Sequence, residues 1–111
     1  MPELPVDNIQ KRWGYEEILV NGDYCCKKLH IYQGAVTSYH SHPVKMETFM
    51  LQEGEVLVQL EGQWVRLRNK PLTIRPGQFH LIIGLTDAVI MEVSTHHSDD
   101  DVVRETTSIM P

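Results

Sequence analysis

Long apolar runs and an excess of positive charge are both missing from this sequence. No stretch of about 18 apolar residues exists, which excludes a transmembrane helix. The N-terminal stretch MPELPVDNIQKRW has no apolar signal core, so we expect a cytoplasmic protein without a membrane partner. Lys and Arg number 10 against 15 Asp and Glu, and the net charge of −5 disfavours binding to the phosphate backbone of nucleic acids.

Cysteine is also scarce, because Cys25 and Cys26 are the only two and they are adjacent. Neighbouring residues of a strand point to opposite faces, so a disulfide between them would strain the backbone. We expect two reduced thiols, at least one of them buried, and a structural rather than a redox role. Much of the acidity lies in one run, Asp99-Asp100-Asp101, which is either a solvated turn or a substrate-side element.

Helical periodicity is absent, and apolar residues alternate instead with a period of two in short segments. The candidate strands are Glu16–Val20, Tyr24–Tyr32, Ala35–His40, Glu47–Gln52, Glu55–Leu60, Trp64–Arg68, Leu72–Ile74, His80–Ile83 and Ala88–Thr95. Turn residues separate them, and Glu61-Gly62 between EVLVQL and QWVRLR predicts a tight hairpin. The pattern predicts an all-β sandwich or barrel.

The 111 residues fit one domain, which buries roughly two-thirds of its unfolded surface. We expect an extended N-terminal arm over residues 1–15, because Pro2 and Pro5 disfavour a helix there, and a barrel over residues 16–97. The polar tail, residues 98–111, either runs over the surface or pairs with a second subunit. Because the edge strands of a small barrel need covering, we expect a homodimer.

Four residues have the chemistry of a metal site. His40 and His42 are two apart, so in a strand they share a face. A turn at Pro43-Val44 would let Glu47 begin the next antiparallel strand and face the same space, and His80 opens a later strand. Imidazoles with a carboxylate suit one divalent first-row ion, which means manganese, iron, cobalt, nickel or zinc.

The spacing Gly34-x5-His40-x-His42-x4-Glu47-x6-Gly54 resembles the first motif of the cupin superfamily. RPGQFH is similar to the second motif, although Pro76-Gly77 are adjacent and Gly84 stands where asparagine is common. The resemblance implies a small single-domain cupin, that is, a double-stranded β-helix with a jelly-roll-like antiparallel barrel. It also implies one metal ion bound by three histidines and a glutamate, here His40, His42, His80 and Glu47.

Lys45 and Glu92 decide what a metal could be used for. Lys45 lies two residues before Glu47 and should share its face, where it is either a proton-transfer group or a solvated side chain at the barrel mouth. In DAVIMEVST, one face carries Ala88, Ile90, Glu92 and Ser94 and the other carries Val89, Met91 and Val93. Periodicity leaves open which face looks inward.

His40-x-His42-x-x-Lys45-x-Glu47 resembles the pattern of the D-lyxose isomerase group of cupins. Trp13-Gly14-Tyr15-Glu16 and EVSTHHSDDDVVR are similar to segments of cupin-type phosphomannose isomerases. The resemblance implies a metal-dependent aldose–ketose isomerase for a small sugar or sugar phosphate, acting through a cis-enediolate with Lys45 and Glu92 as catalytic residues. The chain is about half the length of a typical D-lyxose isomerase and lacks that group's glycine-rich stretch.

Further polar residues could complete a sugar pocket or have only structural or surface roles, namely His30, Tyr32, His96, His97 and Arg104. Arg104 is the phosphate candidate, because a planar guanidinium matches an oxyanion. His96 and His97 are adjacent, so at most one of them faces a given site. Two other functions stay open on the same ligands: a non-enzymatic metal-binding cupin that binds a sugar or another small molecule, and an iron-dependent dioxygenase.

Overall fold

The computed structural model describes residues 7–106, which form strands joined by turns and loops. The strands are β1 (Asp7–Lys11), β2 (Gly14–Asn21), β3 (Tyr24–Ile31), β4 (His40–Ser41), β5 (Glu47–Glu53), β6 (Val56–Leu60), β7 (Gln63–Leu67), β8 (Leu72–Ile74), β9 (His80–Gly84), β10 (Ala88–Thr95) and β11 (Val103–Arg104). Within this part of the chain there is no helix, and hence none long and apolar enough to cross a membrane.

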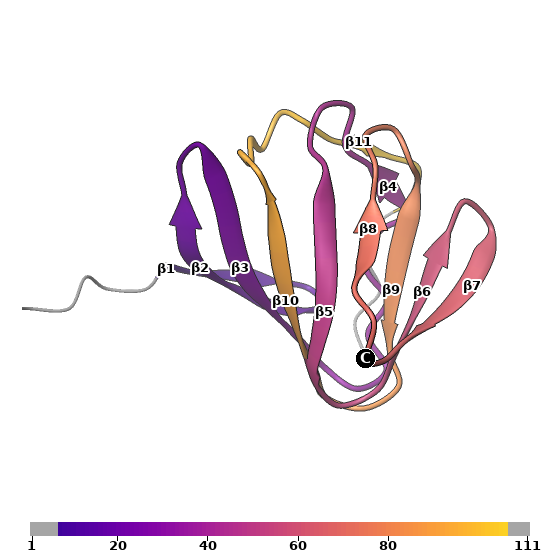
Figure 1. Ribbon diagram of the computed structural model, residues 1–111. Helices are drawn as coiled ribbons and strands as arrows, with labels where there is room; N and C mark the ends of the chain where they lie inside the picture. The colour runs from indigo at the N-terminus through magenta and orange to yellow at the C-terminus, as the bar shows by residue number, and fades with distance from the viewer. Residues whose placement is uncertain (1–6, 107–111) are drawn as a thin grey trace, which may run out of the picture.

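Two antiparallel sheets make up the molecule (Figure 1). The larger has six strands in the order β1-β2-β3-β10-β5-β8, and the smaller has five in the order β11-β4-β9-β6-β7. Apolar side chains from strands of both sheets form one core, which contains Leu29, Ile31, Phe49, Val56, Val58, Leu67, Ile74, Ile82 and Ile90. The expected all-β, single-domain fold is confirmed.

The period-two pattern of the sequence is the alternation of buried and less buried side chains in the two central strands. In β3 the buried positions include Cys25 and Lys27, and in β10 they include Ile90 and Glu92. The two strands pair directly, with Lys27 opposite Glu92. Polar and charged side chains therefore interrupt the apolar inner face of the large sheet.

The hairpin expected at Glu61-Gly62 is present between β6 and β7. Leu60 pairs with Gln63, which leaves a two-residue turn, and both turn residues have positive φ, 48° at Glu61 and 80° at Gly62. Two positive φ values belong to the turn whose twist matches that of the flanking strands, which is why the hairpin closes tightly.

Three segments differ from the sequence expectation. The segment from Ala35 to Tyr39 makes only one β-bridge, at Val36. In a regular strand pair a backbone carbonyl would accept the Ile82 N–H, but here the Thr37 hydroxyl accepts it at 2.9 Å, and the ladder is interrupted. Residues 7–11 of the expected arm pair with β2 of the same chain, and residues 1–6 lie outside the described residues. Within the expected tail, β11 pairs with β4, and residues 107–111 again lie outside the description.

Both cysteines are free thiols, as expected. Cys25 is fully buried on the inner face of the large sheet, while Cys26 lies on the other face with its Sγ 3.3 Å from Sδ of Met91. Burial raises the pKa of both thiols. They are therefore protonated at neutral pH and serve as packing groups.

Candidate metal centre and cavity

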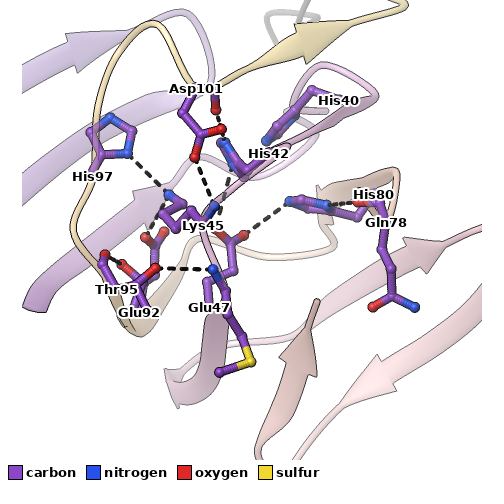
Figure 2. A network of polar contacts seen from close by, with 12 residues as sticks. His40, His42, Lys45, Glu47, Gln78, His80, Glu92, Thr95, His97 and Asp101 are labelled. Atoms are coloured by element: carbon purple, nitrogen blue, oxygen red, sulfur yellow. Dashed lines mark hydrogen bonds and ion pairs between the residues drawn. The ribbon is translucent and has the colours of Figure 1, made fainter. Parts of the chain in front are cut away.

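The three histidines of the motifs come together from two neighbouring strands and the turn that follows one of them. His40 in β4 pairs directly with His80 in β9, and His42 follows β4 by one residue. Their candidate ligand atoms all lie within 4.8 Å of one another. Glu47, the first residue of β5, faces the same point after the turn at Pro43-Val44, as predicted (Figure 2).

Each of these imidazoles donates its Nδ1–H to a backbone carbonyl. The acceptors are Ser38 O at 2.7 Å for His40, Asp101 O at 2.7 Å for His42 and Gln78 O at 3.0 Å for His80. A carbonyl cannot donate, so the proton of each neutral ring is fixed on Nδ1 and the lone pair on Nε2. This is how metal-ligating histidines are oriented in proteins.

Glu47 supplies the observation that tests the fit of a metal. Its Oε1 lies 3.1 Å from Nε2 of His80 and its Oε2 lies 3.5 Å from Nε2 of His42. Within residues 7–106, the buried His80 Nε2 has no hydrogen-bond partner, and the atom that it faces is the carboxylate oxygen Oε1 of Glu47. Two lone pairs facing each other repel unless a cation lies between them, so the four residues fit a divalent metal ion.

Burial also keeps the ligands in the form that binds metal. Desolvation by burial lowers the pKa of His40 to about 3. Burial raises the pKa of Glu47, but the ammonium group of Lys45 beside its carboxylate outweighs this effect and lowers the pKa. At neutral pH the site therefore presents a neutral imidazole and a carboxylate.

Lys45 lies at the centre of a second set of contacts beside these ligands (Figure 2). Its Nζ is 3.0 Å from Glu47 Oε2 and 3.1 Å from both Glu92 Oε2 and His97 Nδ1. Glu92 therefore faces inward, which settles what periodicity left open. Burial and the charge of Glu47 raise the pKa of Glu92, whereas Glu92 and Glu47 raise the pKa of Lys45 against the effect of burial.

These groups open onto one cavity of about 600 Å³. Its wall includes the four candidate metal ligands together with Lys45 and Glu92, and two further residues named from the sequence, His97 and Arg104. The cavity volume lies within the roughly 300–1,000 Å³ of small-molecule sites. One open cavity therefore brings the candidate metal ligands and the candidate acid–base groups together.

Sequence reasoning missed a second charged pair in the cavity wall. Lys27 is only 1% exposed, and its Nζ lies 3.3 Å from Glu16 Oε1. A lysine so deeply buried needs a partner or a function. The alternation in YCCKKLHI placed Lys27 on the same face as Leu29 and Ile31, and this was the available clue.

Three of the expected substrate-binding residues, His30, Tyr32 and His96, lie outside the wall of this cavity. His30 is on the outer face of β3, where it stacks on Tyr15 with ring centroids 4.2 Å apart and contacts Glu17 at 2.9 Å. Tyr32 follows β3 and is 40% exposed. His96 is exposed and contacts Gly22 O, so of the adjacent pair it is His97 that faces the site. Strand alternation explains the placement of His30.

No protein-family model matches the sequence, and no curated protein matches it significantly. Solved structures do match. KdgF from Halomonas sp. is 20% identical, with a TM-score of 0.76 over 85% of this chain and 89% of that one. Pac13 of Streptomyces, in complex with uridine, is 12% identical, with a TM-score of 0.78 over 96% of this chain and 93% of that one.

Oxalate decarboxylase from Bacillus subtilis is 14% identical, with a TM-score of 0.72 over 90% of this chain. This chain spans 30% of that longer protein. The chain has the cupin fold. Within the cupin barrel, the candidate ligands come from β4, β5, β9 and the turn after β4, and Glu92 comes from β10. The fold therefore brings residues that are far apart in the sequence into one cavity.

Proposed function

We propose that this cupin is a metal-dependent aldose–ketose isomerase for a small sugar or sugar phosphate of the D-lyxose or D-mannose type. The observation that carries the proposal is the contact of Lys45 with both Glu47 and Glu92 at 3.0 and 3.1 Å. It joins a buried acid–base pair to a metal ligand in one cavity. The solved neighbours include a nucleoside dehydratase and an oxalate decarboxylase, which supports an enzymatic role.

A divalent ion held by His40, His42, His80 and Glu47 would supply Lewis-acid polarisation of a carbonyl oxygen, worth several kcal/mol to a developing oxyanion. Glu92 takes the proton from C2 of the aldose and returns it to C1. Its raised pKa suits a carboxyl group that must hold a proton between two steps. Lys45 transfers the hydroxyl proton from O2 to O1, so the reaction neither gains nor loses a proton.

The part of the large sheet beyond Glu92, formed by β2 and β3, binds the rest of the substrate in this proposal. Lys27 and Glu16 place a donor beside an acceptor, an arrangement that suits sugar hydroxyl groups. Arg104 is exposed and lines the same cavity, which suits a substrate phosphate if one is present. His97 holds the ammonium group of Lys45 from the side opposite Glu47 (Figure 2).

Proton NMR in D₂O tests the proposal. Metal-loaded protein is screened against aldoses, ketoses and their phosphates, and deuterium incorporated at C1 or C2 identifies the substrate and the proton abstraction together. Lys45→Ala and Glu92→Gln should each lower turnover at least about tenfold while metal content stays full, since a positioned acid–base group contributes about 10²–10⁴-fold. Glu53→Gln, at an exposed carboxylate of β5, is the matched control and should keep full turnover.

Three results would contradict this function. Unchanged turnover in both cavity variants would remove the acid–base roles. No exchange with any sugar, together with saturable sugar binding, would instead assign a binding cupin, and oxygen uptake by the iron-loaded protein would assign a dioxygenase.

A further inference from the structure

The segment after β10 returns to the metal centre and is tied down beyond it. β11 pairs with β4, so that Arg104 lies opposite His40 and Val103 opposite Ser41. The Glu105 N–H donates to Tyr39 O at 2.9 Å just beyond this pairing. The segment between Thr95 and Val103 therefore spans the site, anchored on β10 at one end and on β4 at the other.

Within this segment, Asp101 contacts the ligand-bearing turn through three bonds (Figure 2). Its carbonyl oxygen accepts the Nδ1–H of His42 at 2.7 Å. Its carboxylate oxygens accept the consecutive backbone N–H groups of Val44 and Lys45, each at 2.8 Å. A charged acceptor makes these bonds roughly twice as strong as neutral ones.

The geometry of the turn makes these bonds important for the metal centre. The turn joins His42 to Glu47 and carries Lys45 between them, so its conformation sets the separation of two candidate ligands. Val44 at its tip is 76% exposed, so burial of that side chain does not hold the turn. The two N–H bonds to Asp101 instead fix the backbone beside Lys45.

The same segment also holds the Lys45 side chain. His97 Nδ1 lies 3.1 Å from Lys45 Nζ, and His97 Nε2 lies 3.0 Å from Asp99 Oδ1. Lys45 is therefore fixed by Asp101 at its backbone and by His97 at its ammonium group. Asp100, between the two contributing aspartates, is exposed.

We propose that Asp101 is a positioning residue for the metal centre, acting through His42 and through the turn that carries Lys45 and Glu47. It sets the direction of the His42 lone pair and the distance between His42 and Glu47. Of the three consecutive aspartates, Asp101 alone binds the ligand-bearing turn through its side chain. The inference rests on the metal site of the proposed function and on no particular substrate.

Cobalt binding tests the proposal, with Asp101→Asn compared against Asp100→Asn. Both changes remove one negative charge from the run Asp99-Asp100-Asp101. Only Asp101→Asn places a side-chain NH₂ group, which is a donor, opposite a backbone N–H, which is also a donor, so that one hydrogen bond is lost. We expect Asp101→Asn to weaken Co²⁺ affinity about 10–100-fold, the usual effect of losing an outer contact to a metal ligand. The visible Co²⁺ absorption bands should also shift, while Asp100→Asn should match the unchanged protein in both measurements.

Amide hydrogen exchange on metal-free protein gives an independent measurement. The Val44 and Lys45 amides should exchange at least tenfold faster in Asp101→Asn, and the amides of β3 and β10 should be unaffected. If Asp101→Asn does not fold, Asp101→Ser, whose single uncharged oxygen is one bond closer to the backbone, should show the same loss of Co²⁺ affinity and the same faster amide exchange. Wild-type Co²⁺ affinity and spectrum in the variants, or unchanged exchange of both amides, would overturn the proposal. Absence of Co²⁺ binding by the unchanged protein would reject the metal site, and exchange would then decide the positioning role alone.

Discussion

Glu47 connects the histidine cluster to the candidate acid–base pair of Lys45 and Glu92. Its carboxylate faces His80 on one side and the Lys45 ammonium group on the other. A buried carboxylate in that position would be costly without a positive charge beside it, which Lys45 supplies on one side and a metal ion would supply on the other. It therefore links metal binding to the charge state of the acid–base pair. Removal of the metal should leave Glu47 bound more closely by Lys45, and removal of Lys45 should leave the histidine cluster intact.

Lys27 provides a prediction about substrate binding with a matched control on the same strand. Lys27→Met should raise KM at least about tenfold and change kcat less, because the residue lies on β3, two strands away from the candidate metal ligand Glu47 on β5, and contacts the substrate's distal hydroxyl groups in our proposal. Lys28 points to the opposite face of β3, so Lys28→Met should change neither constant. Steady-state kinetics and thermal unfolding measure both. A fall in kcat alone would contradict the assignment.

The histidine cluster gives metal-free protein a pH-dependent stability with a defined sign. The pKa of His40 is about 3 in the folded state and 6.5 for the free side chain. Below about pH 6.5 the unfolded state therefore binds a proton at this residue, whereas the folded state does not. The free energy of unfolding should therefore decrease as pH falls from 7 toward 4, by up to about 1.4 kcal/mol per pH unit from this residue.

Urea unfolding in excess chelator at several pH values measures this dependence. His40→Gln should have a shallower decrease between pH 6.5 and pH 4.5, since its side chain does not titrate. Equal slopes in the two proteins would contradict a buried neutral His40.

At the scale of elements, the sequence predicted the strands that alternate clearly and the convergence of the four candidate metal ligands that two motifs carry. It could not assign the inner face of β10, because Val89, Met91 and Val93 are as apolar as Ala88 and Ile90. The pairing of β10 between β3 and β5 decides that face, and this pairing is not local. The contacts of Asp101 were missed for the same reason, since they are made with residues distant in the chain, and β11 was missed because it has only two residues. β1 pairs with its neighbour β2 and was missed because Pro2 and Pro5 favoured an extended arm.

Two loop glycines give a paired prediction about the connections. Gly54 and Gly77 have nearly equal φ, 80° and 83°, which any residue with a side chain adopts at a cost of about 1 kcal/mol. A Cβ at Gly77 would meet no atom within 4 Å, whereas one at Gly54 would lie 2.2 Å from the Asp87 carbonyl oxygen. Gly77→Ala should cost about 1 kcal/mol, and Gly54→Ala should cost several times more, because backbone must also move. Denaturant unfolding compares them, and equal costs would contradict the close approach of this loop to Asp87.

At the scale of the whole molecule, the two sheets enclose a polar cavity beside an apolar core. The core packs on Phe49, Val58 and Ile82, and the cavity is lined by Lys27, Glu92 and the histidines. The charged inner wall weakens the core of a small domain, which is the usual cost of a functional site. The expected homodimer stays a prediction, and the outer edge of β1 in the six-stranded sheet is the surface that we propose for it.

Anomalous X-ray diffraction from metal-loaded crystals, collected at the absorption edge of the added ion, tests the central claim most directly. We predict one peak per chain, about 2.0–2.2 Å from Nε2 of His40, His42 and His80 and from a carboxylate oxygen of Glu47. His80→Ala should abolish the peak. The absence of a peak in the unchanged protein would contradict the account. A metal ion bound by other residues, and not by the three imidazoles, would also contradict it.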